Sequence, residues 1–228
     1  MGLNVTRVKN TLPAKRASLL SREQIELVVD AGADVGNYGR VLRASGYRGQ
    51  ILSFEPTAAA YRVLEHATRG DPKWTAKQMA LGDLNGAGII NVASASVCSS
   101  LLAVTPAVLK AAAGSMPVSR EAVTIARLDS IEEMGRPIAI YLKLDVQGSE
   151  LQVLRGCGQA IARVIAIESE VSFVKLYEGQ VLAGEMLTEL ARLGFDPIWV
   201  ERGFTDPESN HMLQADVLFL RRDRKISQ

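Results

Sequence analysis

A regular alternation of short apolar runs with helix-like segments is the feature of this sequence that most constrains its fold. Runs rich in β-branched residues predict strands at residues 25–29, 50–54, 75–80, 89–93, 138–144, 163–167, 197–200 and 216–220. Helical patterns stand between them at residues 38–44, 58–68, 149–155 and 185–193. The run at 138–144 is apolar over nearly its whole length, which is typical of the buried centre of a parallel sheet. The alternation therefore predicts an α/β fold, a doubly wound and mostly parallel sheet with helices on both faces.

The loop after the first predicted strand indicates which kind of ligand the protein binds, because ligands of such sheets bind outside the carboxyl ends of the strands. It reads Asp30-Ala31-Gly32-Ala33-Asp34-Val35-Gly36-Asn37. A dinucleotide-binding loop needs a glycine where Asp34 stands, and a carboxylate there would repel a pyrophosphate. A ligand with no phosphate and a positive centre fits this loop better. S-adenosylmethionine, which carries a sulfonium, is such a ligand.

Two carboxylates of this unit are placed to hold S-adenosylmethionine. Asp30 can serve the positive centre directly or through water, and Gly32 lets the backbone approach the amino acid portion. Glu55 follows the second predicted strand and can accept hydrogen bonds from both ribose hydroxyls. The alternative is structural: Gly32 and Gly36 would only permit a tight turn, and Glu55 would be a charge at a helix N-terminus.

Four longer motifs carry a resemblance to a known family. They are residues 28–38, the Phe54-Glu55-Pro56 turn, residues 80–86, and Leu142-Lys143-Leu144-Asp145-Val146-Gln147-Gly148-Ser149-Glu150 with the Val153-Leu154-Arg155-Gly156 that follows. Together they resemble the FkbM family of S-adenosylmethionine-dependent class I methyltransferases, over residues 27–220. The resemblance implies a Rossmann-like, seven-stranded sheet whose last strand is antiparallel. It also implies methylation of hydroxyl oxygens on sugars, glycolipids or polyketide-derived secondary metabolites.

The resemblance and the loop together predict the cofactor site. The expected cofactor-binding residues are Asp30, Gly32, Ala33, Asn37, Glu55, Pro56, Ala80, Leu81 and Asp145, with Ala80 and Leu81 forming the adenine wall. The chain departs from the family at two positions. Asp34 stands where members usually carry Asn, and Gln147 stands where they usually carry an acidic residue. The second departure argues against a catalytic or metal role for that position.

Methyl transfer to a hydroxyl needs a general base within hydrogen-bond reach of the acceptor oxygen. Asp145 follows the predicted central strand and should emerge beside the reacting centre. Glu170, expected just after the next strand, and His211, in a late loop, are the other predicted catalytic residues. A divalent metal such as magnesium is a weaker alternative, because carboxylates at strand ends can serve hydrogen bonding equally well.

The charge balance disfavours a nucleic-acid partner. The 26 Lys and Arg residues against 25 Asp and Glu residues give a net charge of +1. No Asn/Asp-Pro-Pro-aromatic segment, the usual support for methylating an exocyclic amine, is present in the sequence. A small-molecule hydroxyl acceptor is therefore expected, with a nucleic-acid or protein methyltransferase and a non-catalytic binding domain as the alternatives.

Composition and the chain ends complete the expectations. Two cysteines without metal-ligand spacing, and no apolar stretch long enough to span a membrane, fit the cytoplasm. A homodimer is the default for an enzyme of this size. Residues 1–24 are expected to be a solvated basic leader, residues 25–222 the methyltransferase domain and residues 223–228 a tail. The irregular stretches 94–119 and 202–214 should build the acceptor pocket.

Overall fold

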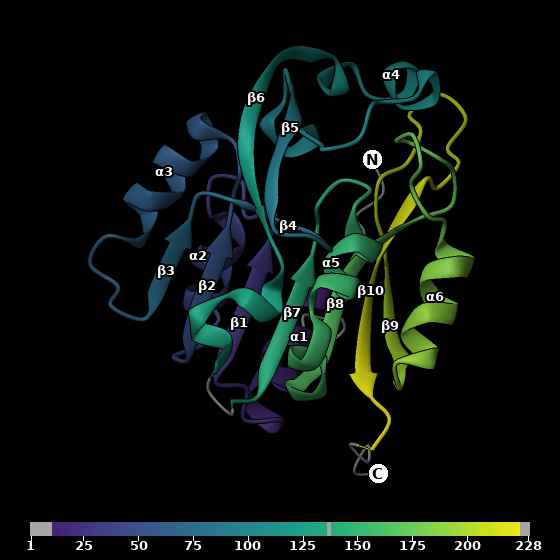
Figure 1. Ribbon diagram of the computed structural model, residues 1–228. Helices are drawn as coiled ribbons and strands as arrows, with labels where there is room; N and C mark the ends of the chain where they lie inside the picture. Colours follow the sequence, from purple (N-terminus) through teal and green to yellow (C-terminus); the bar gives the residue numbers. More distant parts are fainter. Residues whose placement is uncertain (1–10, 136–137, 224–228) are drawn as a thin grey trace.

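A seven-stranded sheet organises the chain, with strand order β3-β2-β1-β7-β8-β10-β9 (Figure 1). The computed structural model describes residues 11–135 and 138–223. The sheet strands are β1 (Leu27–Ala31), β2 (Gln50–Phe54), β3 (Trp74–Lys77), β7 (Ile140–Leu144), β8 (Val164–Ser172), β9 (Phe195–Arg202) and β10 (Gln214–Arg221).

The pairing directions confirm the predicted fold class. β1 pairs in parallel with β2 and β7, and β8 continues the parallel set beside β7. The last strand, β10, is antiparallel to both of its neighbours, β8 and β9. Every residue of β1 and of β7 is buried, as expected for strands covered on both faces.

Two apolar cores fill the two faces of the sheet. The first packs the strands against α5 (Glu150–Gly156) and α6 (Ala183–Arg192), through residues such as Val153 and Met186. The second packs the opposite face against α1 (Leu12–Arg22), α2 (Asn37–Ala44) and α3 (Ala58–Thr68). Trp74 belongs to this second core. Helices therefore cover both faces, which is the doubly wound arrangement.

A second, three-stranded sheet of order β4-β6-β5 was not predicted. It consists of β4 (Ala80–Leu81), β5 (Gly86–Ala93) and β6 (Pro117–Ala126), and it rises above the carboxyl ends of the main strands in Figure 1. The strand predicted at 75–80 is thus divided, because β3 ends at Lys77 and Ala80 already belongs to the second sheet. The stretch 94–119 is also less irregular than expected, since it contains α4 (Pro106–Ala111) and the start of β6.

Helix α1 is not the solvated arm that its basic residues suggested. Leu12, Leu19 and Leu20 are buried in the second core, and Arg16 is only 6% exposed. These residues share one helical face, because they are spaced by four, three and one positions. Parts of the predicted leader and tail, residues 1–10 and 224–228, lie outside the described residues. In the ranges that the structure describes, no helix has the length and apolar character to span a bilayer.

Candidate functional site

The glycine loop after β1 touches the loop after β7 through backbone alone. Gly32 has φ +77, and a Cβ at this position would lie 1.8 Å from the carbonyl oxygen of Asp145. No side chain fits in that space, so glycine is required for the two loops to meet. The next turn residue, Asp34, has φ 47 and donates its backbone N–H to Glu55 Oε2 at 3.0 Å. The β1 loop is thereby fixed to the ends of both neighbouring strands.

Asp30 lies beneath this loop and lines none of the three cavities described below. Its side chain is fully buried, and it accepts a hydrogen bond from Ser53 Oγ at 3.0 Å. Lys143 Nζ lies 3.3 Å from Asp30 Oδ1 and donates to the carbonyl of Gly32 at 3.0 Å. Burial alone would lower the pKa of Lys143, but the carboxylates of Asp145, Asp30 and Glu168 outweigh it and raise that pKa. The structure thus gives Asp30 a lysine as its cationic partner.

Glu55 stands at the end of β2 with its carboxylate fixed by three donors. Oε1 accepts hydrogen bonds from the Thr57 N–H at 2.8 Å and the Thr57 hydroxyl at 2.6 Å, and Oε2 accepts from Asp34. A carboxylate has about four acceptor positions, so the remaining one is on Oε2. Burial raises the pKa of Glu55, against the lowering effect of the Thr57 bonds. The group can therefore accept one further hydroxyl with a defined geometry.

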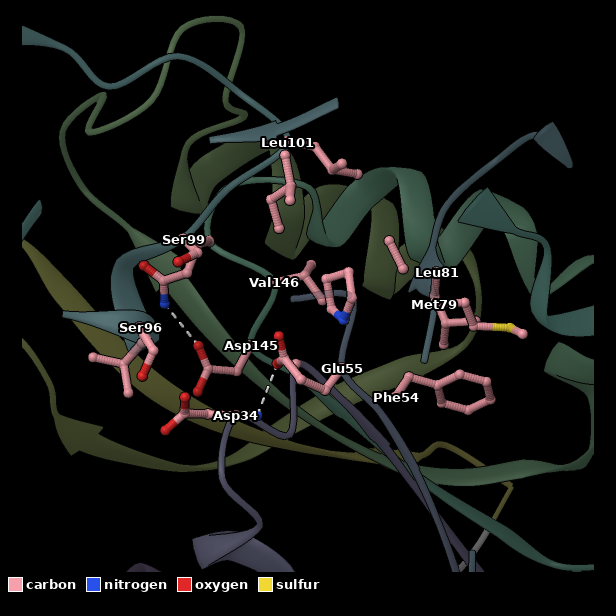
Figure 2. A pocket seen from close by; sticks show the side chains of 16 residues that line it. Asp34, Phe54, Glu55, Met79, Leu81, Ser96, Ser99, Leu101, Asp145 and Val146 are labelled. Carbon is pink, nitrogen blue, oxygen red and sulfur yellow. Dashed lines mark hydrogen bonds between the residues drawn. The ribbon is translucent and has the colours of Figure 1, made fainter. Parts of the chain in front are cut away.

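A first cavity joins Glu55 to the second sheet. Pro56, Met79, Ala80 and Leu81 supply its apolar side, and Ser96 and Ser99 come from the segment after β5. Figure 2 shows the carboxylates of Asp34, Glu55 and Asp145 gathered on one side, with Met79, Leu81 and Phe54 on the other. Four predicted cofactor residues besides Gly32 and Asp145 line this cavity: Glu55, Pro56, Ala80 and Leu81. The structure therefore brings these six predicted residues together around one cavity.

Asp145 lines three cavities that meet at its carboxylate. Its side chain is 41% exposed, and Oδ2 lies 3.3 Å from Lys143 Nζ. Oδ1 accepts a hydrogen bond from Gln147 Nε2 at 2.8 Å. The carboxylate is thus oriented by a cation on one oxygen and an amide on the other, while part of it still faces open space.

The second cavity lies between α1, α2 and the strand ends, and is rich in charge. Ala33 and Asn37, both predicted cofactor residues, line it rather than the first cavity. Arg16 also lines it and binds Glu168 through two nitrogens, at 2.6 and 2.5 Å. The hydroxyls of Tyr38 and Tyr141 donate to the same Glu168 carboxylate. Helix α1 is therefore joined to the wall of the site by a buried, bidentate ion pair.

Glu170 lies within β8, because this strand extends to Ser172 and not only to residue 167 as predicted. Asp216 on β10 is its direct cross-strand partner. Burial and the neighbouring carboxylate of Asp145 raise the pKa of Glu170 well above its ordinary value. Burial likewise raises the pKa of Asp216 to about 6. Among the described residues, the donors to the Glu170 carboxylate are two side-chain amides, Gln214 Nε2 at 2.5 Å and Gln147 Nε2 at 3.3 Å.

A third cavity of about 260 Å³ opens on the other side of Asp145 and Glu170. Its lining is largely apolar and includes Val97, Val108, Tyr177 and Phe204. Asp145, Gln147, Glu170 and Gln214 form its polar part. This cavity combines an apolar enclosure with two carboxylates, one of which has a raised pKa.

His211, a predicted catalytic residue, and Glu150, from the motif around Asp145, lie outside the three cavities. His211 is exposed on the segment between β9 and β10 and lines none of these three cavities. Glu150 is buried, and its Oε1 accepts the N–H groups of Val146 and Gly148 at 3.2 and 3.1 Å. Glu150 thus shapes the turn that carries Asp145. Within residues 11–135 and 138–223, no three His, Cys, Asp or Glu side chains are grouped to hold a metal ion.

Two residues of the site were missed by sequence reasoning. Arg16 was assigned to a solvated segment, although it shares a helical face with Leu12, Leu19 and Leu20. The spacing of these four residues in the sequence could have predicted that this face of the helix is buried. Tyr177 reaches Gln147 Oε1 with its hydroxyl at 2.7 Å, from a loop 30 residues along the chain. No local pattern marks such a contact.

Comparison with known proteins identifies the family. The model of the methyltransferase FkbM domain matches residues 30–197 of this chain. The chain belongs to the FkbM methyltransferase family. It is accordingly an S-adenosylmethionine-dependent methyltransferase, and the resemblance noted from its motifs is confirmed. No curated protein sequence gave a match.

A solved methyltransferase structure has the same fold. Magnesium protoporphyrin IX methyltransferase from Synechocystis PCC 6803, solved with bound SAM, is 9% identical, with a TM-score of 0.50 over 92% of this chain and 77% of that one. An rRNA methylase from Streptococcus thermophilus is 10% identical, with a TM-score of 0.49 over 96% of this chain and 99% of that one. At these identities, the likeness of this FkbM-family chain to the magnesium protoporphyrin enzyme concerns the fold alone.

Proposed function

We propose that this FkbM-family methyltransferase transfers a methyl group to a hydroxyl oxygen of a small molecule. The observation that carries the proposal is the position of Asp145, which lines both the cavity beside Glu55 and the cavity beside Glu170. A cofactor in the first and an acceptor in the third would meet at this carboxylate. Holding both reactants in such a shared geometry is the main catalytic task in methyl transfer.

The first cavity suits the nucleoside part of S-adenosylmethionine. The remaining acceptor position on Glu55 Oε2 would bind a ribose hydroxyl, and Met79, Ala80 and Leu81 would pack against the adenine. Gly32, Ala33 and Asn37 would contact the amino acid portion from the second cavity. Asp30 would act indirectly, because its buried carboxylate holds Lys143. When bound, the cofactor supplies a methyl group on a sulfonium.

The third cavity suits the acceptor. In it Glu170 would take the proton of the acceptor hydroxyl, and Asp145 would orient that hydroxyl by accepting a hydrogen bond. A carboxyl whose pKa is raised by burial is a stronger base once ionised, which favours this role for Glu170. Glu170 is proposed ahead of His211, since His211 lines none of the three cavities. The volume of about 260 Å³ fits a small molecule or one ring of a larger one.

We also propose that the transfer needs no divalent metal. The amide nitrogen of Gln147 lies 2.8 Å from Asp145 Oδ1 and 3.3 Å from Glu170 Oε2. A metal ion that joined these two carboxylates would have to displace this neutral donor. Activity should therefore persist after EDTA treatment and should not rise when magnesium is added.

Calorimetric titration with S-adenosylmethionine and S-adenosylhomocysteine tests the cofactor assignment, with NAD as the control ligand. Wild-type protein should bind both nucleosides and not NAD. Glu55→Ala should weaken binding by about 10- to 100-fold, since it removes a hydrogen bond to a charged group. Absence of binding to folded wild-type protein would refute the assignment of the first cavity.

A transfer assay tests the reaction itself. Labelled methyl groups should appear on the oxygen of sugars or hydroxylated secondary metabolites in an acceptor panel. Glu170→Gln should abolish most of this transfer and still leave S-adenosylhomocysteine binding measurable, because the nucleoside part would lie in the first cavity, which Glu170 does not line. Transfer only to RNA or protein in the same panel would contradict the proposal.

A further inference from the structure

Gln147 uses its whole side chain to join the carboxylates of the site to a surrounding loop. Its Nε2 donates to Asp145 Oδ1 at 2.8 Å and to Glu170 Oε2 at 3.3 Å. Its Oε1 accepts a hydrogen bond from the Tyr177 hydroxyl at 2.7 Å. An amide has two N–H donors, one for each carboxylate. The Tyr177 bond fixes which end of the amide faces them, because a hydroxyl donor requires the oxygen end.

The backbone of Gln147 is held in an unfavourable conformation. Its φ is 54, a value that non-glycine residues seldom adopt. The buried hydroxyl of Ser100 donates to the Gln147 carbonyl at 2.6 Å, which ties this turn to the segment after β5. A strained residue persists where the surrounding structure fixes it, and such residues gather at functional sites.

The two carboxylates that share this amide stand in different surroundings. Asp145 has a cation at 3.3 Å, in Lys143. In the part of the chain that the structure describes, the Glu170 carboxylate accepts hydrogen bonds from the neutral amides of Gln147 and Gln214 and from no cation. The charged and titratable groups that act most strongly on Glu170, or that it acts on, include Asp145, Lys143, Glu150, Asp216, Cys98 and Tyr177. Without a donor between them, Asp145 and Glu170 would repel each other.

We propose that Gln147 is a positioning residue, whose neutral amide holds Asp145 and Glu170 side by side so that one orients the acceptor hydroxyl and the other takes its proton. The inference rests on the proposed function for the roles of the two carboxylates. The hydrogen-bonding role of Gln147 is independent of it. Ser100 and Tyr177 extend the arrangement, because they hold the backbone and the amide of Gln147 from two separate segments.

The test follows the carboxyl groups directly, by carbon-13 NMR titration of labelled Asp and Glu in the full-length protein with bound S-adenosylhomocysteine. Asp145→Asn and Glu170→Gln assign the two signals. Gln147→Asn is the main variant, since Asn tolerates positive φ but is one methylene shorter and cannot reach both carboxylates. Of the two carboxylates, Gln214→Ala removes an amide donor from Glu170 only, and Gln159→Ala is a control at an exposed residue that lines none of the three cavities.

Gln147→Asn should raise the titration midpoints of both carboxyls, by about one pH unit for the loss of each hydrogen bond. Gln214→Ala should shift the Glu170 signal with little effect on Asp145, and Gln159→Ala should shift neither. In the transfer assay, the acidic limb of the kcat/KM profile should move upward in Gln147→Asn, and kcat at pH 7 should fall about tenfold.

Unchanged Asp145 and Glu170 titrations in folded Gln147→Asn would overturn the proposal. The titrations could instead shift while Glu170→Gln keeps full methyl transfer. In that case Gln147 still positions the two carboxylates, and the assignment of Glu170 as the base fails. The two proposals are thus distinguished by one set of variants.

Discussion

The carbonyl oxygen of Asp145 lies 1.8 Å from the point at which a Cβ on Gly32 would stand. The loops after the neighbouring strands β1 and β7 therefore meet backbone to backbone, between the first and second cavities. Lys143 Nζ strengthens the same junction, because it donates to the carbonyl of Gly32. Asp145, which lines all three cavities, can occupy its position only because the β1 loop has a glycine at position 32.

Gly32→Ala should disrupt this junction. The new methyl group would overlap backbone atoms that cannot rotate away, and φ +77 adds strain, so the loss in the free energy of unfolding should be about 4 kcal/mol or more. Gly46→Ala is the matched control, because Gly46 has φ +95 with no atom within 4 Å of its Cβ position. It should cost only about 1 kcal/mol. Urea unfolding of both variants provides the comparison, and equal losses would show that the Gly32–Asp145 contact is not limiting.

Arg16→Met should destabilise the protein strongly. The substitution removes the bidentate partner of Glu168 and leaves a carboxylate that is only 6% exposed without its cation. Breaking a buried ion pair in this way costs about 3–5 kcal/mol. Arg222→Met removes an exposed pair with Asp196 and should leave the urea midpoint nearly unchanged. Similar midpoints for the two variants would mean that the buried Arg16–Glu168 pair contributes no more to stability than an exposed pair.

The alternation of apolar runs and helical patterns was enough to predict the main sheet. It did not predict strands whose residues are exposed. β1 and β7 are wholly buried, so each carries a continuous apolar run that reads as a central strand. β6 is mostly exposed over residues 117–121, and its sequence, with Ser, Arg and Glu, gives no such run. The second sheet was therefore missed, although residues 89–93 within β5 were identified.

The site was predictable where its residues follow strand ends. Glu55 and Asp145 were identified because parallel strands bring their carboxyl ends to one edge. The partners of Gln147 and Glu170 were not, since Tyr177 and Gln214 reach them across 30 and 44 residues of sequence. Such contacts depend on how the loops pack, and periodicity carries no information about that.

Glu150 should make stability depend on pH. Burial raises its pKa from an ordinary value near 4.5 to about 7. The folded state therefore holds a proton that the unfolded state has released, and stability falls as pH rises from about 4.5 to about 7. The size of this loss is about 3 kcal/mol if the whole shift is realised. Thermal melts between pH 5 and pH 8 should show the decline in wild-type protein.

Glu150→Gln should flatten this pH dependence. The amide oxygen can still accept the N–H groups of Val146 and Gly148, but it carries no charge at any pH. Some decline should remain, because burial also raises the pKa of Asp216 to about 6. Glu185→Gln, on the exposed side of α6, should keep the wild-type profile. If the melting temperature of Glu150→Gln falls with pH as steeply as that of wild type, Glu150 is not the titrating group.

Substitutions at Lys143 and Asp30 should have non-additive effects on the free energy of unfolding. Lys143→Met alone leaves the fully buried Asp30 and the Asp145 carboxylate without their shared cation, so a loss of about 3–5 kcal/mol is expected. Asp30→Asn in the same chain removes the uncompensated charge but keeps an oxygen that can accept from Ser53. The double variant should therefore be more stable than the sum of the two single losses predicts, by at least about 1 kcal/mol. Additive losses in a double-mutant cycle would show that the 3.3 Å contact carries no net interaction, and that Lys143 is retained for its bond to the Gly32 carbonyl.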